Sequence, residues 1–247
     1  GRRRHSSAAQ VHFVACAHNL ASSLSTSIEL IETLGKAIRG GYSVLVYEDG
    51  STDSTREQLL QWAAQNSNVR LILADPLSEA VPRTERLGLC RNVLLRESIA
   101  ASGPHESTAP SAETRAVMVS LDFDCDHRQT LSTSVFARAV SMLQPSVRRG
   151  VRPEHDALFG NSMPAYYDLW ALRSARLGID YDCLGTTQLA LKQRYGHCFL
   201  HEITLDVGAP PLPVDSAFNG LGLYTASAWM HCATGRMFLP PKRSGLP

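Results

Sequence analysis

Residues 42–51, YSVLVYEDGS, join a short apolar run to an abrupt polar end. The first six residues have the composition of a strand that is buried on both faces, as in a parallel sheet. The Asp-Gly pair that follows supplies turn chemistry. A helix is predicted next, over residues 54–66, because Ser54 and Glu57 have capping-box spacing before an apolar stripe. This stretch therefore predicts a strand, a turn and a helix in succession.

The same alternation continues on both sides of this stretch. A helical stripe after the first strand starts near Thr26, which has Glu29 at capping-box spacing. Strands are predicted at 11–17, 69–73, 117–121 and 157–160, and further helices at 25–39, 86–99 and 131–143. Alternating strands and helices predict an α/β fold, with a mostly parallel sheet and helices on both faces.

Length and composition are those of one large domain. The 247 residues are 44% hydrophobic and 19% charged, and we expect a single domain over 1–247. Residues 1–10 are expected to be a disordered end, and the Ser-, Ala- and Pro-rich residues 101–114 an exposed loop.

Net charge and apolar patterning exclude several classes of partner. The formal charge of +1 disfavours a general nucleic-acid binder, and no apolar run approaches the roughly 20 residues that span a bilayer. The six cysteines form no CxxC pair, which disfavours a zinc cluster and leaves their pairing and the cellular compartment open. No histidine pair has HExxH spacing.

A run of alternating carboxylates directly follows the predicted strand 117–121. In extended backbone, Asp122 and Asp124, with Asp126 as a possible third, share one face while the residues between them point the other way. Carboxylate oxygens suit Mg²⁺ or Mn²⁺, which keep open positions for substrate phosphates. The alternative is a solvated acidic turn. Ligands bind at the carboxyl ends of strands in open α/β sheets, which favours the metal site.

Other polar residues are predicted at the same edge of the sheet. Glu48 and Asp49 can accept hydrogen bonds from a base or ribose, or can serve turn and N-cap chemistry alone. Asn19 follows the first strand and has the same two interpretations. Arginine forks match phosphate oxygens, and we favour Arg91 over Arg86 because a spacing of five does not place both on one helical face.

Two carboxylates in the second half are candidates for sugar chemistry. Asp168 and Asp215 are flanked by aromatic or glycine residues that can shape a sugar pocket, and each can act as a base or accept from a sugar hydroxyl. The alternative for each is a helix cap or a buried hydrogen-bond partner, and the residues favour this alternative.

The pattern as a whole resembles the GT-A glycosyltransferases. The matching residues are the first strand, residues 48–55 (EDGSTDST), Arg91-Asn92 on a helix, and Leu121-Asp122-Phe123-Asp124. The second stretch is similar to the D-D-G-S-x-D motif of that group, with Glu48 in place of its first aspartate. The resemblance implies a GT-A, Rossmann-like fold. It also implies that Glu48 and Asp49 approach the nucleoside, Arg91 the diphosphate, and Asp122 and Asp124 the ribose and metal.

A looser resemblance narrows the group. Residues 83–92, 167–170 and 216–220 look like the capsule-associated mannosyltransferases, and similar motifs occur in glycosyltransferases of large algal viruses. The expected activity is transfer of a sugar, a hexose above all, from a UDP- or GDP-sugar to a hydroxyl of a glycan or glycoconjugate acceptor, with Mn²⁺ or Mg²⁺.

The resulting site has nucleotide-sugar, metal and catalytic residues. Nucleotide-sugar binding is expected from Asn19, Glu48, Asp49, Arg86, Arg91, Asp122 and Asp168, and metal binding from Asp122 and Asp124. Asp215 would take the acceptor proton in an inverting enzyme. The alternatives are a sugar nucleotidyltransferase, for which no glycine-rich signature with a following lysine is present, and a non-catalytic domain that binds a sugar or nucleotide.

Overall fold

The structure is a computed structural model that describes residues 10–76, 81–101, 116–124, 131–144, 155–161, 168, 171–178, 206 and 208–234. No helix in these ranges is long and apolar enough to cross a membrane. Asp126 and the predicted loop 101–114, apart from its first residue, lie outside the described residues.

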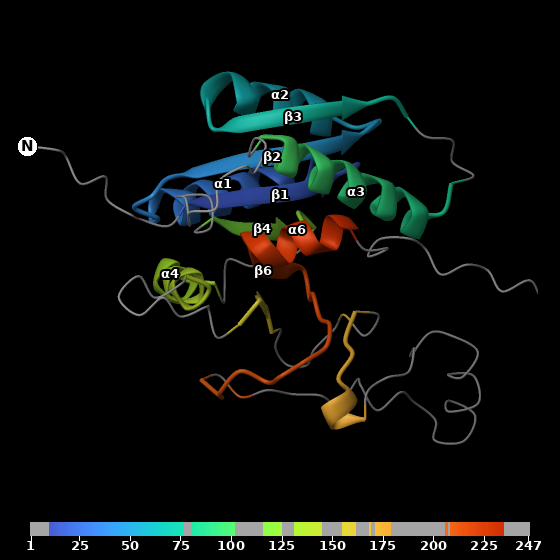
Figure 1. Ribbon diagram of the computed structural model, residues 1–247. Coiled ribbons are helices and arrows are strands. Elements are labelled where there is room, and N and C mark those ends of the chain that lie inside the picture. The colour runs from blue at the N-terminus through green and yellow to red at the C-terminus, as the bar shows by residue number, and fades with distance from the viewer. Residues whose placement is uncertain are drawn as a thin grey trace, which may run out of the picture. The chain divides into compact units, whose positions relative to one another are not determined.

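A six-stranded sheet with the order β3-β2-β1-β4-β6-β5 is the centre of the fold (Figure 1). Its strands are β1 (Val11–Ala17), β2 (Tyr42–Asp49), β3 (Val69–Ala74), β4 (Val117–Leu121), β5 (Ala157–Phe159) and β6 (Leu221–Thr225). The pairs β1–β2, β1–β4 and β2–β3 are parallel, as predicted. β6 runs antiparallel to its neighbour β4. This direction follows from the amide of Ala226, at the end of β6, which donates to the carbonyl of Ala116, just before β4.

Helices cover both faces of the sheet, which confirms the predicted α/β class. They are α1 (Leu24–Lys36), α2 (Thr55–Gln65), α3 (Arg83–Ala101), α4 (Thr133–Met142) and α6 (Ala226–Thr234), with a short 3₁₀ helix η2 (Ala175–Leu177). α3 and α6 contact each other on the near face in Figure 1, whereas α1, which contacts both α2 and α4, lies behind the sheet.

An apolar cluster holds α3 and α6 on their face of the sheet. Its buried members are Val14, Leu45, Cys90, Leu94, Leu95, Met118 and Trp229. The indole of Trp229 also donates to the hydroxyl of Ser98, which joins the two helices at 2.9 Å. Burial of each large apolar side chain contributes about 1.5–3 kcal/mol, so α3 is fixed along most of its length.

The opposite face packs on aromatic rings and is tied to the acidic turn after β4. Phe13 of β1 stacks on Phe136 of α4, with ring centroids 5.8 Å apart. Ser27 of α1 is buried, and its hydroxyl donates to the carbonyl of Phe123 at 2.9 Å. Because Phe123 is itself buried, this bond fixes the backbone between Asp122 and Asp124.

β2 is longer than the sequence predicts. The predicted strand ends at Tyr47, but Glu48 and Asp49 continue it and pair in register with Leu73 and Ala74 of β3. The turn comes at Gly50, which has φ +59° and lies so close to Pro76 that a Cβ would sit 2.3 Å from its Cα. The prediction was wrong because turn residues were taken to interrupt a strand that its neighbour extends.

Both predicted capping boxes were also wrong. α1 begins at Leu24 after Ser23, so Thr26 lies inside the first turn. α2 does begin after Ser54, but the Ser54 side chain makes no capping bond, and a carboxylate oxygen of Asp53 accepts from the amide of Thr55 instead. Side chains at these helix starts are used in contacts that sequence spacing does not reveal.

The contacts divide the chain into two compact units. The first comprises Gly1–Leu158 with Leu223–Pro247, and the second Phe159–Gly222. β5 and β6 each have residues in both units. A single catalytic domain stays a prediction.

A buried ion pair closes the carboxyl end of β2. Glu48 is 0% exposed, and its oxygens accept from the amide of Ser51 and from Nε of Arg56 on α2, both at 2.5 Å. Arg56 also donates to the carbonyl of Ala74 at the end of β3. One arginine therefore joins a helix and two strand ends beside the turn at Gly50.

Substitution of Arg56 by Met should destabilise the fold by about 3 kcal/mol, because it leaves the Glu48 carboxylate buried without a counter-ion. Arg70→Met is the matched control, since it breaks an exposed pair with Glu97 at 3.1 Å and should cost less than about 1 kcal/mol. Urea denaturation measures both. Equal losses would mean that Glu48 is not held by Arg56.

Candidate functional site

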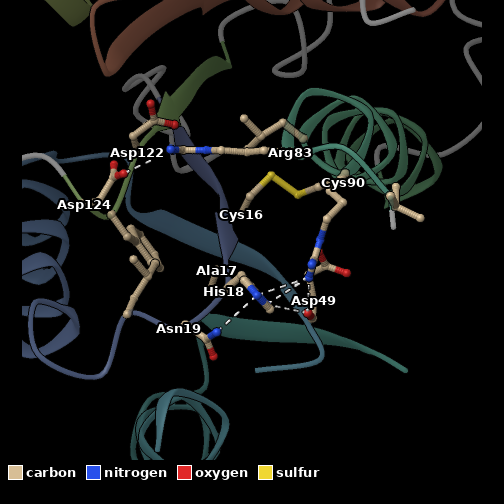
Figure 2. Close-up of a pocket in the computed structure, with 14 residues that line it drawn as sticks. Cys16, Ala17, His18, Asn19, Asp49, Arg83, Cys90, Asp122 and Asp124 are labelled. Atoms are coloured by element: carbon tan, nitrogen blue, oxygen red, sulfur yellow. Dashed lines mark hydrogen bonds and ion pairs between the residues drawn. A yellow bond between two sulfur atoms is a disulfide. The ribbon is translucent and has the colours of Figure 1, made fainter. Parts of the chain in front are cut away.

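One pocket opens at the carboxyl ends of the parallel strands. Its volume is about 530 Å³, within the range of small-molecule sites. The residues that line it come from the ends of β1, β2 and β4 and from the start of α3: Cys16, Ala17, His18, Asn19, Leu20, Asp49, Val81, Arg83, Arg86, Leu87, Cys90, Asp122, Phe123 and Asp124. Charged groups and apolar side chains therefore share one cavity (Figure 2).

The stretch EDGSTDST cross-links the loops that follow β1 and β2. The side-chain oxygen of Asn19 accepts from the amide of Thr52 at 2.8 Å, and the Asn19 amide donates to the hydroxyl of Ser51 at 3.0 Å. The amide of Leu20 donates to the hydroxyl of Thr55 at 2.7 Å. Small polar side chains at this spacing thus act as a scaffold for the pocket wall.

Asp53 completes this scaffold. Its two carboxylate oxygens accept from the amides of Ala21 and Thr55, each at 3.0 Å. Burial alone would raise the pKa of Asp53, but hydrogen bonds from the Thr55 hydroxyl and from these amides outweigh it and lower the pKa. The carboxylate form is therefore the one that binds both loops.

Asp49 is held at the bottom of the pocket by a salt bridge. Its Oδ2 accepts from Nε of Arg86 at 2.8 Å, and the two side chains are only 7% and 17% exposed. Its Oδ1 is buried and accepts no hydrogen bond from the described residues. A buried carboxylate oxygen without a donor is costly, so this atom marks where a ligand donor would be stabilised.

His18 connects Asp49 to the first loop. Its Nδ1 lies 2.7 Å from the carbonyl of Asp49, and its Nε2 lies 3.2 Å from the side-chain nitrogen of Asn19. The carbonyl can only accept, so this hydrogen bond requires a proton on Nδ1. Arg86 Nη2 lies within 3.3 Å of both ring nitrogens, so it also contacts His18.

Burial, followed by the nearby carboxylates of Asp49 and Glu48, raises the pKa of Tyr47. Tyr47 precedes these two residues in β2 and packs against the apolar cluster under α3. Its phenol therefore stays protonated at neutral pH and acts as a packing group.

Helix α3 lies astride β1 and reaches the strands on both sides of it. Cys90 forms a disulfide with Cys16 of β1, with Cα atoms 6.1 Å apart. Arg86 pairs with Asp49 of β2, and Arg91 Nη2 lies 3.8 Å from Oδ1 of Asp122 after β4. Residues five apart on a helix point about 140° apart. In the sequence, the spacing of five argued against a shared role for Arg86 and Arg91. In the structure, the same spacing lets them reach β2 and the end of β4, on opposite sides of β1.

The two aspartates after β4 reach the pocket from the other side. Asp122 and Asp124 are 33% and 49% exposed, while Phe123 between them is buried. Residues 123–124 form a turn, not the extended backbone on which the prediction of a shared face relied. Arg83 extends toward Asp124, with Nη2 and Oδ2 3.5 Å apart (Figure 2). Two partly exposed carboxylates are hard oxygen donors of the kind that Mg²⁺ and Mn²⁺ prefer.

The described residues do not by themselves make up a metal site. Among them, no group of three or more His, Cys, Asp or Glu side chains could hold a metal. Metal binding by Asp122 and Asp124 stays a prediction.

The structure brings together most of the predicted donor-site residues. Asn19, Asp49, Arg86, Asp122 and Asp124 line the one pocket. Glu48 points away from it into the ion pair with Arg56, and Arg91 contacts the site through Asp122 without lining the pocket. Their binding roles stay predictions.

Among the pocket residues that sequence reasoning did not assign, four carry charged, polar or sulfur-containing groups: Cys16, His18, Arg83 and Cys90. His18 directly follows the first strand, so its position next to Asn19 was a usable signal. The disulfide had no such signal, because its cysteines are separated by 74 residues.

Asp168 and Asp215 lie in the second compact unit. Asp168 and Asn219 bind each other reciprocally, each amide donating to the other's side-chain oxygen, at 3.3 and 3.2 Å. Asp215 Oδ2 accepts from the amide of Ala175 at 2.6 Å and so caps η2, while the residue stays exposed. Both contacts are structural: one is a hydrogen-bonded pair and the other a helix cap, the alternatives expected from the sequence. The roles of Asp168 and Asp215 in sugar binding and catalysis stay predictions.

Comparison with known proteins finds similarity among solved structures only. No family model matches the chain, and no curated protein matches it. The chain is similar to the mannosyltransferase PcManGT from Pyrobaculum calidifontis in complex with GDP-Man and Mn²⁺ (18% identity, 63% of this chain and 36% of that one, TM-score 0.41).

The chain is similar to two further solved structures, with comparable identities and TM-scores. They are glucosyl-3-phosphoglycerate synthase from Mycobacterium tuberculosis with Mn²⁺, UDP and glucosyl-3-phosphoglycerate (14% identity, 89% and 57% coverage, TM-score 0.40) and S. aureus TarS 1-349 with UDP-GlcNAc (14%, 66% and 39%, 0.39). The chain spans between 36% and 57% of the length of these three proteins. The capsule-associated and algal-virus resemblances stay predictions.

Proposed function

We propose that this protein is a glycosyltransferase that binds a nucleoside diphosphate sugar in the pocket at the carboxyl ends of β1, β2 and β4 and transfers the sugar, a hexose, to a hydroxyl of a glycan or glycoconjugate. The observation that carries the proposal is the buried Oδ1 of Asp49, which has no donor among the described residues. An N–H or O–H of the nucleoside would satisfy it.

The pattern of free acceptors favours uridine over guanosine. Arg86 occupies Oδ2 of Asp49, so one carboxylate oxygen is left. Uracil presents one N–H on its pairing edge, between two carbonyls, whereas guanine presents donors from two nitrogens side by side. The single N–H of uracil matches the one buried oxygen that has no donor, whereas the two guanine donors would also have to use the oxygen that Arg86 already binds.

The other side of the pocket suits the diphosphate. Asp122 and Asp124 would hold Mg²⁺ or Mn²⁺, which when bound would stabilise the negative charge of the departing diphosphate. Arg83 is exposed and lines the same pocket, so its planar guanidinium can bind phosphate oxygens. Apolar side chains such as Val81 and Leu87 would limit water around the nucleotide.

Asp215 is the proposed base for an inverting transfer. A carboxylate can accept the proton of the attacking hydroxyl, and Asp215 is exposed in the second unit. Its bond to Ala175 orients the side chain and uses one oxygen, Oδ2.

Substitution of Asp49 by Asn should weaken UDP binding by about ten- to a hundredfold, because one hydrogen bond to a buried charged acceptor is lost. Calorimetry with Mn²⁺ present measures this, and UDP should bind the wild type more tightly than GDP. Asp75→Asn, an exposed carboxylate just after β3, is the control and should bind UDP normally. Unchanged affinity of a folded Asp49→Asn protein would exclude this nucleoside site.

Removal of the metal should weaken UDP binding by about tenfold or more, since typical couplings between two bound ligands are of that size. The comparison is UDP titrated with Mn²⁺ and with EDTA. Asp124→Ala and Asp122→Asn should bind UDP equally under both conditions. Tight UDP binding by the wild type in EDTA would rule out the shared metal.

Substitution of Asp215 by Asn should lower sugar transfer by about a hundredfold or more and leave UDP affinity unchanged, because a base acts only in the chemical step. Transfer from UDP-hexoses to a panel of glycans, followed by mass spectrometry, measures the rate. Asp206→Asn, at another exposed position of the second unit, is the control. Wild-type transfer by Asp215→Asn would remove this residue from the chemistry.

A further inference from the structure

The disulfide between Cys16 and Cys90 lies in the wall of the pocket. Both cysteines are among the residues that line the cavity, and their bond joins the end of β1 to α3 (Figure 2). Cys90 is 2% exposed and belongs to the apolar cluster under α3, whereas Cys16 is only partly buried. The sulfur of Cys16 is therefore the one that a small molecule in the pocket can reach.

The bond attaches the end of α3 that faces the pocket. In residues 83–89, no side chain that the structure describes is buried, and Leu89 is 49% exposed. The buried apolar side chains of the helix begin at Cys90 and continue with Leu94 and Leu95. The disulfide is thus the first point, counted from the start of α3, at which a buried apolar side chain fixes the helix on the sheet.

Arg86 is coupled to this attachment. It precedes Cys90 by four positions, so both residues lie on one face of α3. Its Nε lies 2.8 Å from Oδ2 of Asp49 at the bottom of the pocket. When Cys90 is released from β1, the helical turn that carries Arg86 loses its nearest covalent attachment. The position of Arg86 relative to Asp49 is then held less tightly.

We propose that the Cys16–Cys90 bond is a thiol–disulfide exchange site, at which a small dithiol enters the pocket and reversibly separates α3 from β1. Its reduction lowers the affinity of the pocket for a nucleotide, so the redox state of one bond regulates the site. The use of a nucleotide as the readout rests on the proposed function, whereas the exchange itself does not.

The exchange takes two balanced steps. One thiolate of the dithiol attacks the sulfur of Cys16 and forms a mixed disulfide there, while the original S–S bond breaks and Cys90 leaves as a thiolate. The second thiolate of the reagent attacks the mixed disulfide, which releases Cys16 and closes the reagent into a cyclic disulfide. The two protein thiolates take up the two protons that the dithiol has lost. The protein gains two electrons, and the dithiol is oxidised by two.

Reduction with dithiothreitol should weaken UDP binding about fivefold or more, the lower end of typical couplings between two sites. Calorimetry with Mn²⁺ measures this on the oxidised full chain and on the reduced chain after the reagent is removed under nitrogen. Linkage makes the effect reciprocal, so UDP should disfavour reduction by the same factor. Alkylation and mass spectrometry of the two cysteine peptides, at set ratios of reduced to oxidised dithiothreitol, measure that factor.

The double variant Cys16→Ala, Cys90→Ala is the control, because it has no bond to open at this position. It keeps the other four of the six cysteines, so any effect of dithiothreitol on those remains visible. Its UDP affinity should match that of the reduced wild type and should not change with dithiothreitol.

Hydrogen exchange gives a readout that needs no nucleotide. Reduction should speed the exchange of the amides of residues 83–90, at the released end of α3. The amides of α2 should exchange at the same rate in both forms, because α2 packs against α1 and β3. A disulfide that merely stabilises the whole fold would change both helices together.

The outcomes separate the two proposals. If oxidised and reduced wild type bind UDP equally, or if the alanine variant responds to dithiothreitol as strongly as the wild type, the inference is overturned and the nucleotide site stands. Reduction that occurs only after urea unfolds the chain would also overturn it. If neither form binds UDP, the proposed function fails by itself. Equal exchange of residues 83–90 in both forms would then overturn the release of α3 as well.

Discussion

The buried carboxylate of Glu48 is the constraint on which the rest of the site depends. A charge with no access to water must be neutralised where it stands, and Arg56 does this while joining α2 to the ends of β2 and β3. Successive residues of a strand face opposite sides of the sheet. With Glu48 committed to the α2 side, Asp49 must face the α3 side, where the pocket lies.

Helix α3 is fixed in a similar way, by contacts with several strands of the sheet. This helix is attached to three neighbouring strands by three kinds of interaction: a covalent bond to β1, a buried salt bridge to β2 and a longer ion pair to the turn after β4. The apolar cluster under α3 stabilises the packing of the helix on the sheet. The polar contacts set the position of the helix. The pocket is thus bounded on one side by an element that is fixed at several points.

Sequence patterns predicted the strands and helices from β1 to α4 because each is long enough to show its own period. The ends were harder, since they depend on neighbours: β2 continues through Glu48 and Asp49 only because β3 pairs with them. β6 and α6 were not predicted, because LGLYT is short and contains glycine, and its place between β4 and β5 comes from pairing across the chain.

Only part of the candidate site could be predicted from the sequence. The rule that parallel strands end together was enough to gather Asn19, Asp49 and Asp122 in advance. It could not show that Glu48 turns away, that Arg86 rather than Arg91 lines the pocket, or that His18 bridges the loops. Those facts depend on side-chain direction and on contacts between residues more than thirty positions apart.

The bond between Cys16 and Cys90 turns the segment from β1 to α3 into a covalent ring whose closing cysteines are 74 positions apart in the sequence. A ring of that size removes conformational freedom from the denatured chain, worth about 4 kcal/mol by loop-closure entropy. A single backbone cut inside the ring would leave both fragments attached, so the halves of the pocket that β1 and α3 supply cannot diffuse apart. The part of the protein that lines the pocket thus carries its own tether, independent of the rest of the chain.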